Sequence, residues 1–131
     1  MGRTELHLSQ ILNTEQYVLN ESEQSTVSTT FVPAASISVS SPGTTYAIFL
    51  SAEGLASTTQ TQLEVQLLVN SDIVASSFIV PIKDNNYWYP YSTMYITGLV
   101  PGTHEISFQF RAANGTSVSV RRVRIFIMDL S

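Results

Sequence analysis

Short runs in which apolar and polar residues alternate cover most of this 131-residue chain, and turn sequences separate them. In residues 63–67, for example, Leu63, Val65 and Leu67 alternate with Glu64 and Gln66. A period of two residues places the apolar side chains on one face of an extended strand, so each run predicts a half-buried β-strand. Beyond residue 20 no segment has the spacing of an amphipathic helix. The pattern therefore predicts an all-β chain.

The alternating runs predict about eight strands, near residues 25–31, 36–40, 44–53, 60–69, 73–80, 87–97, 103–111 and 117–129. Turn sequences such as Ser41-Pro42-Gly43 separate them. About eight short antiparallel strands in one domain predict a β-sandwich, with a jelly roll as the first choice. An immunoglobulin-like sandwich is the alternative. The chain lacks the cysteine pair of that fold, and its only tryptophan comes late.

Composition limits the partners open to such a domain. A chain of 131 residues can bury a core that needs no covalent staple, and it has no cysteine for disulfides or a thiolate zinc site. A net charge of −4 with six Lys and Arg argues against nucleic acid as a partner. No stretch approaches the ~20 apolar residues of a transmembrane helix. The first 20 residues lack the pattern of a signal peptide, so we expect synthesis in a cytoplasm and no membrane partner.

Residues 1–24 differ from the rest and are predicted to form an N-terminal extended arm, ahead of a sandwich domain at residues 25–131. They hold four of the ten acidic residues, and no Gly or Pro interrupts the chain between Arg3 and Phe31. Apolar anchors with little periodicity are typical of a segment that docks on a partner. The anchors are Leu6, Leu8, Ile11, Leu12, Tyr17 and Leu19. The alternative is that this segment packs on its own sandwich or forms a short helix there.

The last predicted strand changes phase at Arg121-Arg122. Val118 and Val120 share one phase, whereas Val123 shares the other phase with Ile125 and Ile127. A slip of one residue is what a β-bulge produces. Past the slip, the strand carries large side chains on its second face as well. These are Arg122, Arg124, Phe126, Met128 and Leu130.

An apolar second face needs a cover, and a neighbouring subunit is the simplest one. We therefore expect a homo-oligomer interface here. Arg122 and Arg124 are expected at its rim, where they can pair with carboxylates such as those of the arm. The alternative cover is the N-terminal arm of the same chain.

Five aromatic residues lie within nine positions, at Tyr87, Trp88, Tyr89, Tyr91 and Tyr95. Exposed Tyr and Trp rings suit sugars and protein hot spots, so the first four form a possible ligand surface. The alternative is that alternate rings fill the core while their polar tips reach the rim.

Catalytic and metal-binding motifs are absent from the sequence. His7 and His104 are the only histidines, and no zinc, phosphate-loop or nucleophile motif is present. His104 and Glu105 are adjacent on a strand, so their side chains point to opposite faces and form no catalytic pair. We expect no enzymatic activity, no metal and no cofactor.

The end of the chain, "ITGLVPGTHEISFQFRAANGTSVSVRRVRIFIMDL", resembles that of small phage virion jelly-roll proteins. In those proteins an alternating strand leads through a Gly turn to a final apolar strand that bears Arg. The residues that match are Gly102, His104, Ile106, Phe108, Phe110, Gly115, Arg122, Val123, Ile125 and Ile127. The resemblance extends as a pattern over residues 25–130 and implies a jelly roll that usually trimerises.

The resemblance implies a virion protein made in the host cytoplasm. The first expectation is a capsid decoration (cement) protein, which would bind the major capsid protein as a trimer. The alternative is a receptor- or glycan-binding tip domain of a phage tail fibre. A free-standing carbohydrate-binding module is a third option.

Overall fold

A computed structural model describes residues 15–56, 61–80 and 87–130 of the chain. The described residues form strands and no helix. The strands are β1 (Glu15–Asn20), β2 (Gln24–Thr26), β3 (Val32–Ser41), β4 (Thr45–Ala56), β5 (Leu63–Val69), β6 (Asp72–Ile79), β7 (Tyr89–Gly98), β8 (Gly102–Ala112) and β9 (Val118–Asp129). The predicted all-β class is confirmed.

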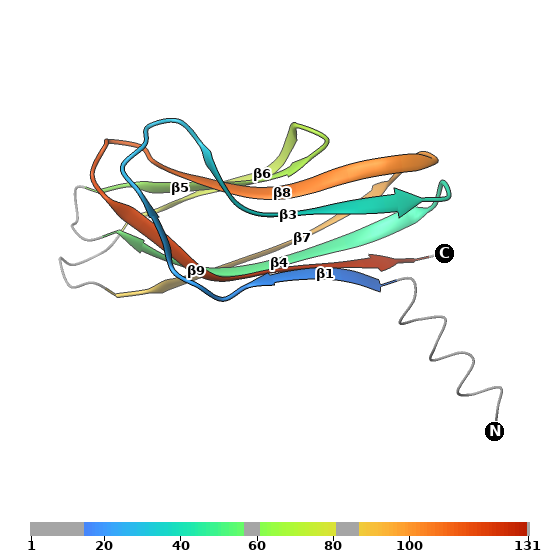
Figure 1. Ribbon diagram of the computed structural model, residues 1–131, viewed down its shortest axis with the longest axis horizontal. Coiled ribbons are helices and arrows are strands. Elements are labelled where there is room, and N and C mark those ends of the chain that lie inside the picture. The colour runs from blue at the N-terminus through green and yellow to red at the C-terminus, as the bar shows by residue number, and fades with distance from the viewer. Residues whose placement is uncertain (1–14, 57–60, 81–86, 131) are drawn as a thin grey trace, which may run out of the picture.

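Two antiparallel sheets pack face to face, as Figure 1 shows. Sheet A has the order β1-β9-β4-β7, and β2 also pairs with β9, beyond the end of β1. Sheet B has the order β3-β8-β5-β6. When β1 and β2 are taken as one interrupted edge strand, each sheet has four strand positions. Successive strands then cross between the sheets as in a jelly roll, except for β5 and β6, which form a hairpin within sheet B. The predicted fold is therefore confirmed.

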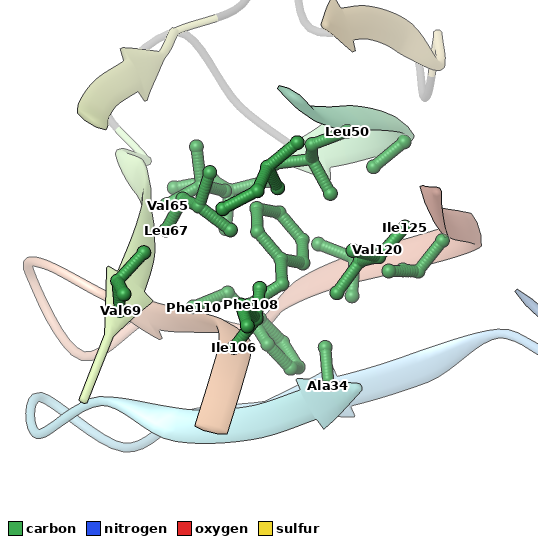
Figure 2. Packing of buried hydrophobic residues seen from close by; sticks show 14 of the residues in the cluster. Ala34, Leu50, Val65, Leu67, Val69, Ile106, Phe108, Phe110, Val120 and Ile125 are labelled. Atoms are coloured by element: carbon green, nitrogen blue, oxygen red, sulfur yellow. The ribbon is translucent and has the colours of Figure 1, made fainter. Parts of the chain in front are cut away.

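The core lies between the sheets and is filled by the inward-pointing side chains of both. Figure 2 shows Phe108 and Phe110 of β8 between Leu67 of β5 and Leu50 of β4. The faces predicted from alternation on β5 and on the first half of β4 are the buried ones. The main difference in strand bounds concerns the predicted strand at residues 25–31, of which only Ser25 and Thr26 pair, as part of β2, whereas β3 extends over Val32–Ser41.

Gly54 of β4 marks a close approach between the sheets. A Cβ atom built on Gly54 would lie 2.6 Å from Cδ2 of Leu63 and 2.7 Å from Cδ1 of Ile79, both of which are buried side chains of sheet B. Because real Cβ contacts are longer than this, any side chain at position 54 must displace its neighbours. The two sheets can approach each other this closely at position 54 because glycine has no side chain.

The predicted boundary between arm and sandwich at residue 24 is wrong. Residues 15–20 already form β1, which pairs with β9 from Glu15↔Met128 to Asn20↔Val123. The side-chain amides of Asn20 and Gln24 both donate to the carbonyl oxygen of Ala34, at 3.1 and 3.0 Å. These bonds tie the edge of sheet A to a register shift in β3 of sheet B. Of the predicted arm anchors, Leu6, Leu8, Ile11 and Leu12 lie outside the described residues.

The predicted phase slip in the last strand is confirmed as a β-bulge. Ser51 of β4 lies opposite Arg124 of β9, but Glu53 lies opposite Arg121, so β9 has one extra residue between these pairs. Arg122 takes φ = 51°, which is in the left-handed region that non-glycine residues rarely adopt. The bulge turns Phe126 and Met128 outward while Val123 and Ile125 stay in the core.

Candidate functional site: the outer face of sheet A

Large apolar side chains form rows across the outer face of sheet A. In one row, Tyr17 of β1 lies opposite Phe126 of β9, which lies opposite Phe49 of β4, which lies opposite Met94 of β7. The next row, toward the end where β9 finishes, has Met128, Ala47 and Ile96 on the same three strands, β9, β4 and β7. We call these two sets the apolar rows. The first row extends across all four strands, and the second covers β9, β4 and β7.

Much of this surface is exposed. Tyr17 keeps 63% of its surface accessible and Met94 keeps 56%, while Phe126 and Met128 are half-buried. The other large exposed apolar side chains on this face are Leu19, Phe49, Ile96 and Leu130. Soluble monomers rarely expose a continuous apolar patch of this kind. Phe126, Met128 and Leu130 therefore lie as the sequence predicted, on the outside of their own fold.

A hollow of about 450 Å³ lies beside the row of Phe49 and Met94. It forms where the next row falls to small residues, because Ser51 of β4 lies opposite Ser92 of β7. Arg124 and Phe126 of β9 line its other side. The same row carries Leu19 at the other edge of the sheet, opposite Arg124.

Charged residues gather at the end of the face near the bulge, and we call them the charged end. Arg124 donates to Oε1 of Glu21 from Nε at 3.0 Å and from Nη2 at 2.8 Å. Arg121 donates from Nε to Oε1 of Glu53 at 2.7 Å, and Arg122 donates from Nη1 to Oε2 of the same carboxylate at 3.3 Å. Glu53 thus forms ion pairs with both arginines of the bulge. The bond from Arg121, with the charges of both arginines, holds the pKa of the Glu53 carboxyl below its ordinary value, although burial opposes this shift.

The outer face of sheet B is polar by comparison. The amide of Gln66 donates to Oε1 of Gln109 at 2.8 Å, and Arg111 forms an ion pair with Glu64. Its large exposed apolar residues, Ile73 and Phe78, lie on the edge strand β6, and Phe78 lies opposite Glu64 rather than an apolar residue. The two outer faces differ in chemistry although the sheets share one fold, so the fold alone does not account for the apolar rows.

Two of the four residues of the possible aromatic ligand surface lie against the core. Tyr89 and Tyr91 are partly buried and pack against the core, where Tyr91 stacks on Phe108 at 6.4 Å between ring centroids. Burial raises the pKa of Tyr91. Trp88 is half-buried, and the guanidinium of Arg121 lies 4.1 Å from its ring centroid. Tyr87 is exposed. The start of β7 therefore fits the alternative interpretation, in which alternate rings of the cluster pack against the core.

His104 has a structural environment. It is buried, and its Nε2–H donates to the carbonyl oxygen of Val100 at 2.7 Å. Its Nδ1 then accepts from Nδ2 of Asn70, also at 2.7 Å. Both ring nitrogens are used, so His104 joins the turn after β5 to the turn before β8. No cluster of metal-ligating side chains occurs among the described residues. The described part of the chain also contains no helix that could cross a bilayer.

The sequence predicted the outward-facing apolar residues of β9, but it did not predict those of β4 and β7. Phe49 lies on the opposite side of β4 from Ile48 and Leu50, so this strand, like β9, is apolar on both faces. That second apolar phase was a readable signal. The outward position of Met94 could not be predicted in this way. Its strand alternates regularly, and the local sequence does not indicate which set of alternate residues faces the core. Tyr17 and Leu19 were expected to dock on a partner, and both are exposed on the outer face.

The sequence matches no protein-family model, and a search of curated proteins finds no match.

Proposed function

We propose that this chain is a bacteriophage structural protein, a capsid decoration protein that stabilises the head by binding the major capsid protein as a trimer. The observation that carries the proposal is the exposed apolar face of sheet A, with Phe49, Met94 and Phe126 in one row. Such a face favours assembly with other protein chains. The resemblance of residues 25–130 to small phage virion proteins supports the assignment to a virion.

Binding energy alone accounts for the action of such a protein. Each copy buries apolar surface against its neighbours, at about 25 cal/mol per Å² before the entropic costs of association. A trimer that contacts the capsid through three equivalent segments holds each contact at high effective concentration of the others. The apolar anchors of residues 1–14, Leu6, Leu8, Ile11 and Leu12, are the proposed contact with the capsid protein.

The second candidate is a receptor- or glycan-binding tip of a tail fibre. Tyr87 and Trp88 favour it, because one is exposed and the other is oriented by Arg121. Both rings lie at the opposite end of the sandwich from the start of β1. They would then face outward if the N-terminal segment held the particle. Only two rings are available, however, since Tyr89 and Tyr91 pack against the core.

The two candidates make different binding predictions. A decoration protein binds empty capsids and raises their melting temperature, whereas a tip protein labels host cells and ignores capsids. The informative variant begins at residue 15, so that β1 and its pairing with β9 are kept. We expect this variant to stay folded and to keep its oligomeric state but to lose capsid binding. Capsid binding at full strength by the truncated chain would contradict the assigned role of residues 1–14.

A further inference from the structure

The outer face of sheet A has a projection on the β1 edge and a hollow toward the β7 edge, in the same row. Leu19 projects from the edge strand β1 with 56% of its surface exposed. On the far side of Arg124, the same row continues into Ser51 and Ser92, where the hollow lies. The projecting Leu19 on the β1 side of the face is therefore complementary in shape to the hollow on the β7 side.

The chemistry of the face also changes along the strands, from apolar at one end to charged at the other. One apolar row extends over β1, β9, β4 and β7 and the other over β9, β4 and β7, whereas the charged end holds Arg121, Arg122 and Glu53. A neighbour that ran in the opposite direction would place its charged end on the apolar rows and desolvate those charges without partners. A neighbour with the same strand direction places apolar rows against apolar rows. The pattern thus fits a second copy related by rotation about an axis along the strands.

We propose that copies of this chain close into a ring about an axis along the strands, with Leu19 of each copy seated in the hollow between β4 and β7 of the next. A contact that joins two different patches is heterologous, and such contacts close into rings when the rotation permits. The inference deepens the proposed trimer, and it rests on that proposal only for the number of copies.

The area and charge of the face fit a second copy as the occupant. Its six large exposed apolar side chains each leave on the order of 100 Å² accessible, which together approaches the ~800 Å² that one partner contributes to a standard interface. The arginines of the charged end are already paired with Glu21 and Glu53 of their own copy. The face therefore needs no strongly acidic foreign surface to neutralise it.

The ring has a consequence for the N-terminal segments. β1 begins at Glu15, opposite Met128 near the end of β9, so each chain enters its sheet at the end of the sandwich where the apolar rows lie. With parallel strands, β1 begins at the same end of the ring in every copy, so the residues that precede β1 join the ring at that end. One side of the assembly then carries every proposed capsid contact.

Cross-linking of the purified full-length chain tests the contact, because the protein has no cysteine of its own. Within one copy, positions 19 and 92 are separated by three strand spacings, about 14 Å, which is beyond disulfide reach. Any disulfide in the Leu19→Cys/Ser92→Cys variant is therefore between copies. We expect oxidation to give covalent species up to a closed ring of three chains on a non-reducing gel, and a single chain after reduction. The control, Leu19→Cys/Ser76→Cys, places the second thiol on an exposed serine of β6 in sheet B and is expected to give none.

A pair of charge substitutions gives an independent readout by light scattering. Met94 on β7 and Phe78 on β6 are 56% and 55% exposed, so both accept lysine without a cavity in the core. We expect Met94→Lys to lower the mass to the 14.4 kDa of one chain and Phe78→Lys to leave the oligomer intact.

Three results would overturn the ring: a wild-type chain of single-chain mass, an oligomer that gives no 19–92 disulfide, or self-cross-linking of Leu19→Cys alone, which indicates a twofold contact. These assays contain no capsid. A ring that forms but does not bind capsids would therefore refute the proposed function and leave the ring standing.

Discussion

Arg122 provides a sharp test of the bulge that turns Phe126 and Met128 outward. Its φ of 51° costs a residue with a Cβ atom about 1–2 kcal/mol, and glycine avoids this cost. At an ordinary strand position glycine is instead less stable than alanine by roughly 0.5–1 kcal/mol. The difference between these effects makes Arg122→Gly more stable than Arg122→Ala by about 0–1.5 kcal/mol. The ion pair with Glu53 is lost in both variants and cancels from the comparison.

Arg124 is the matched control, since it is also an exposed arginine of β9 but has no positive φ. There the order reverses, and Arg124→Gly is expected to be less stable than Arg124→Ala by about 0.5–1 kcal/mol. Urea denaturation of the four variants, followed by circular dichroism, measures the free energies of unfolding at matched ionic strength. If alanine is the more stable residue at both positions, strain at the bulge does not explain the conformation of Arg122.

Three further predictions concern packing, pH and a buried histidine. Gly54→Ala is expected to lower the free energy of unfolding by about 1–3 kcal/mol through overpacking, whereas Gly98→Ala, which meets no atom within 4 Å, changes it little; equal denaturation midpoints would refute the close approach of the sheets. The pKa of Glu53 is lower in the folded chain, so its contribution to stability is present above the ordinary glutamate pKa of about 4.3 and is lost as the pH falls through the folded value. Melting temperatures measured from pH 6 down to about pH 2 should therefore fall less steeply in Glu53→Gln than in the wild type, and parallel curves would contradict the linkage. His104→Ala removes two hydrogen bonds and is expected to lower the free energy of unfolding by about 1–3 kcal/mol without changing the oligomeric state. Urea titration and light scattering measure these two properties. An unchanged denaturation midpoint would mean that the two hydrogen bonds make no net contribution to stability.

Local patterns were enough to predict the fold class, and long-range pairing explains what they missed. Alternation on β5 and the Pro and Gly turns gave most of the strands, and the slip at Arg121-Arg122 gave the bulge. The strand β1 was not predicted, because it has only six residues and no turn sequence comes before it. Its place in sheet A depends on β9, more than 100 residues further along the chain.

The candidate site shows the same limit. The row of Tyr17, Phe126, Phe49 and Met94 comes from four strands that are distant in sequence, and register alone brings these residues together. The sequence could show that β9 has two apolar faces, but it could not show which residues lie beside Phe126. The aromatic cluster left two interpretations open for a related reason, since alternation does not say which of two phases faces the core.

The antiparallel pairing of β1 with β9 also determines how the domain responds to force. A load that separates the start of β1 from the end of β9 peels the two strands apart, because these two points lie at the same end of the sandwich and the hydrogen bonds open one after another. A load between the start of β1 and the turn at Gly115 shears the strand, so that all of its hydrogen bonds resist at once. A chain held by its first residues and pulled from its far tip is therefore loaded in its mechanically strong direction.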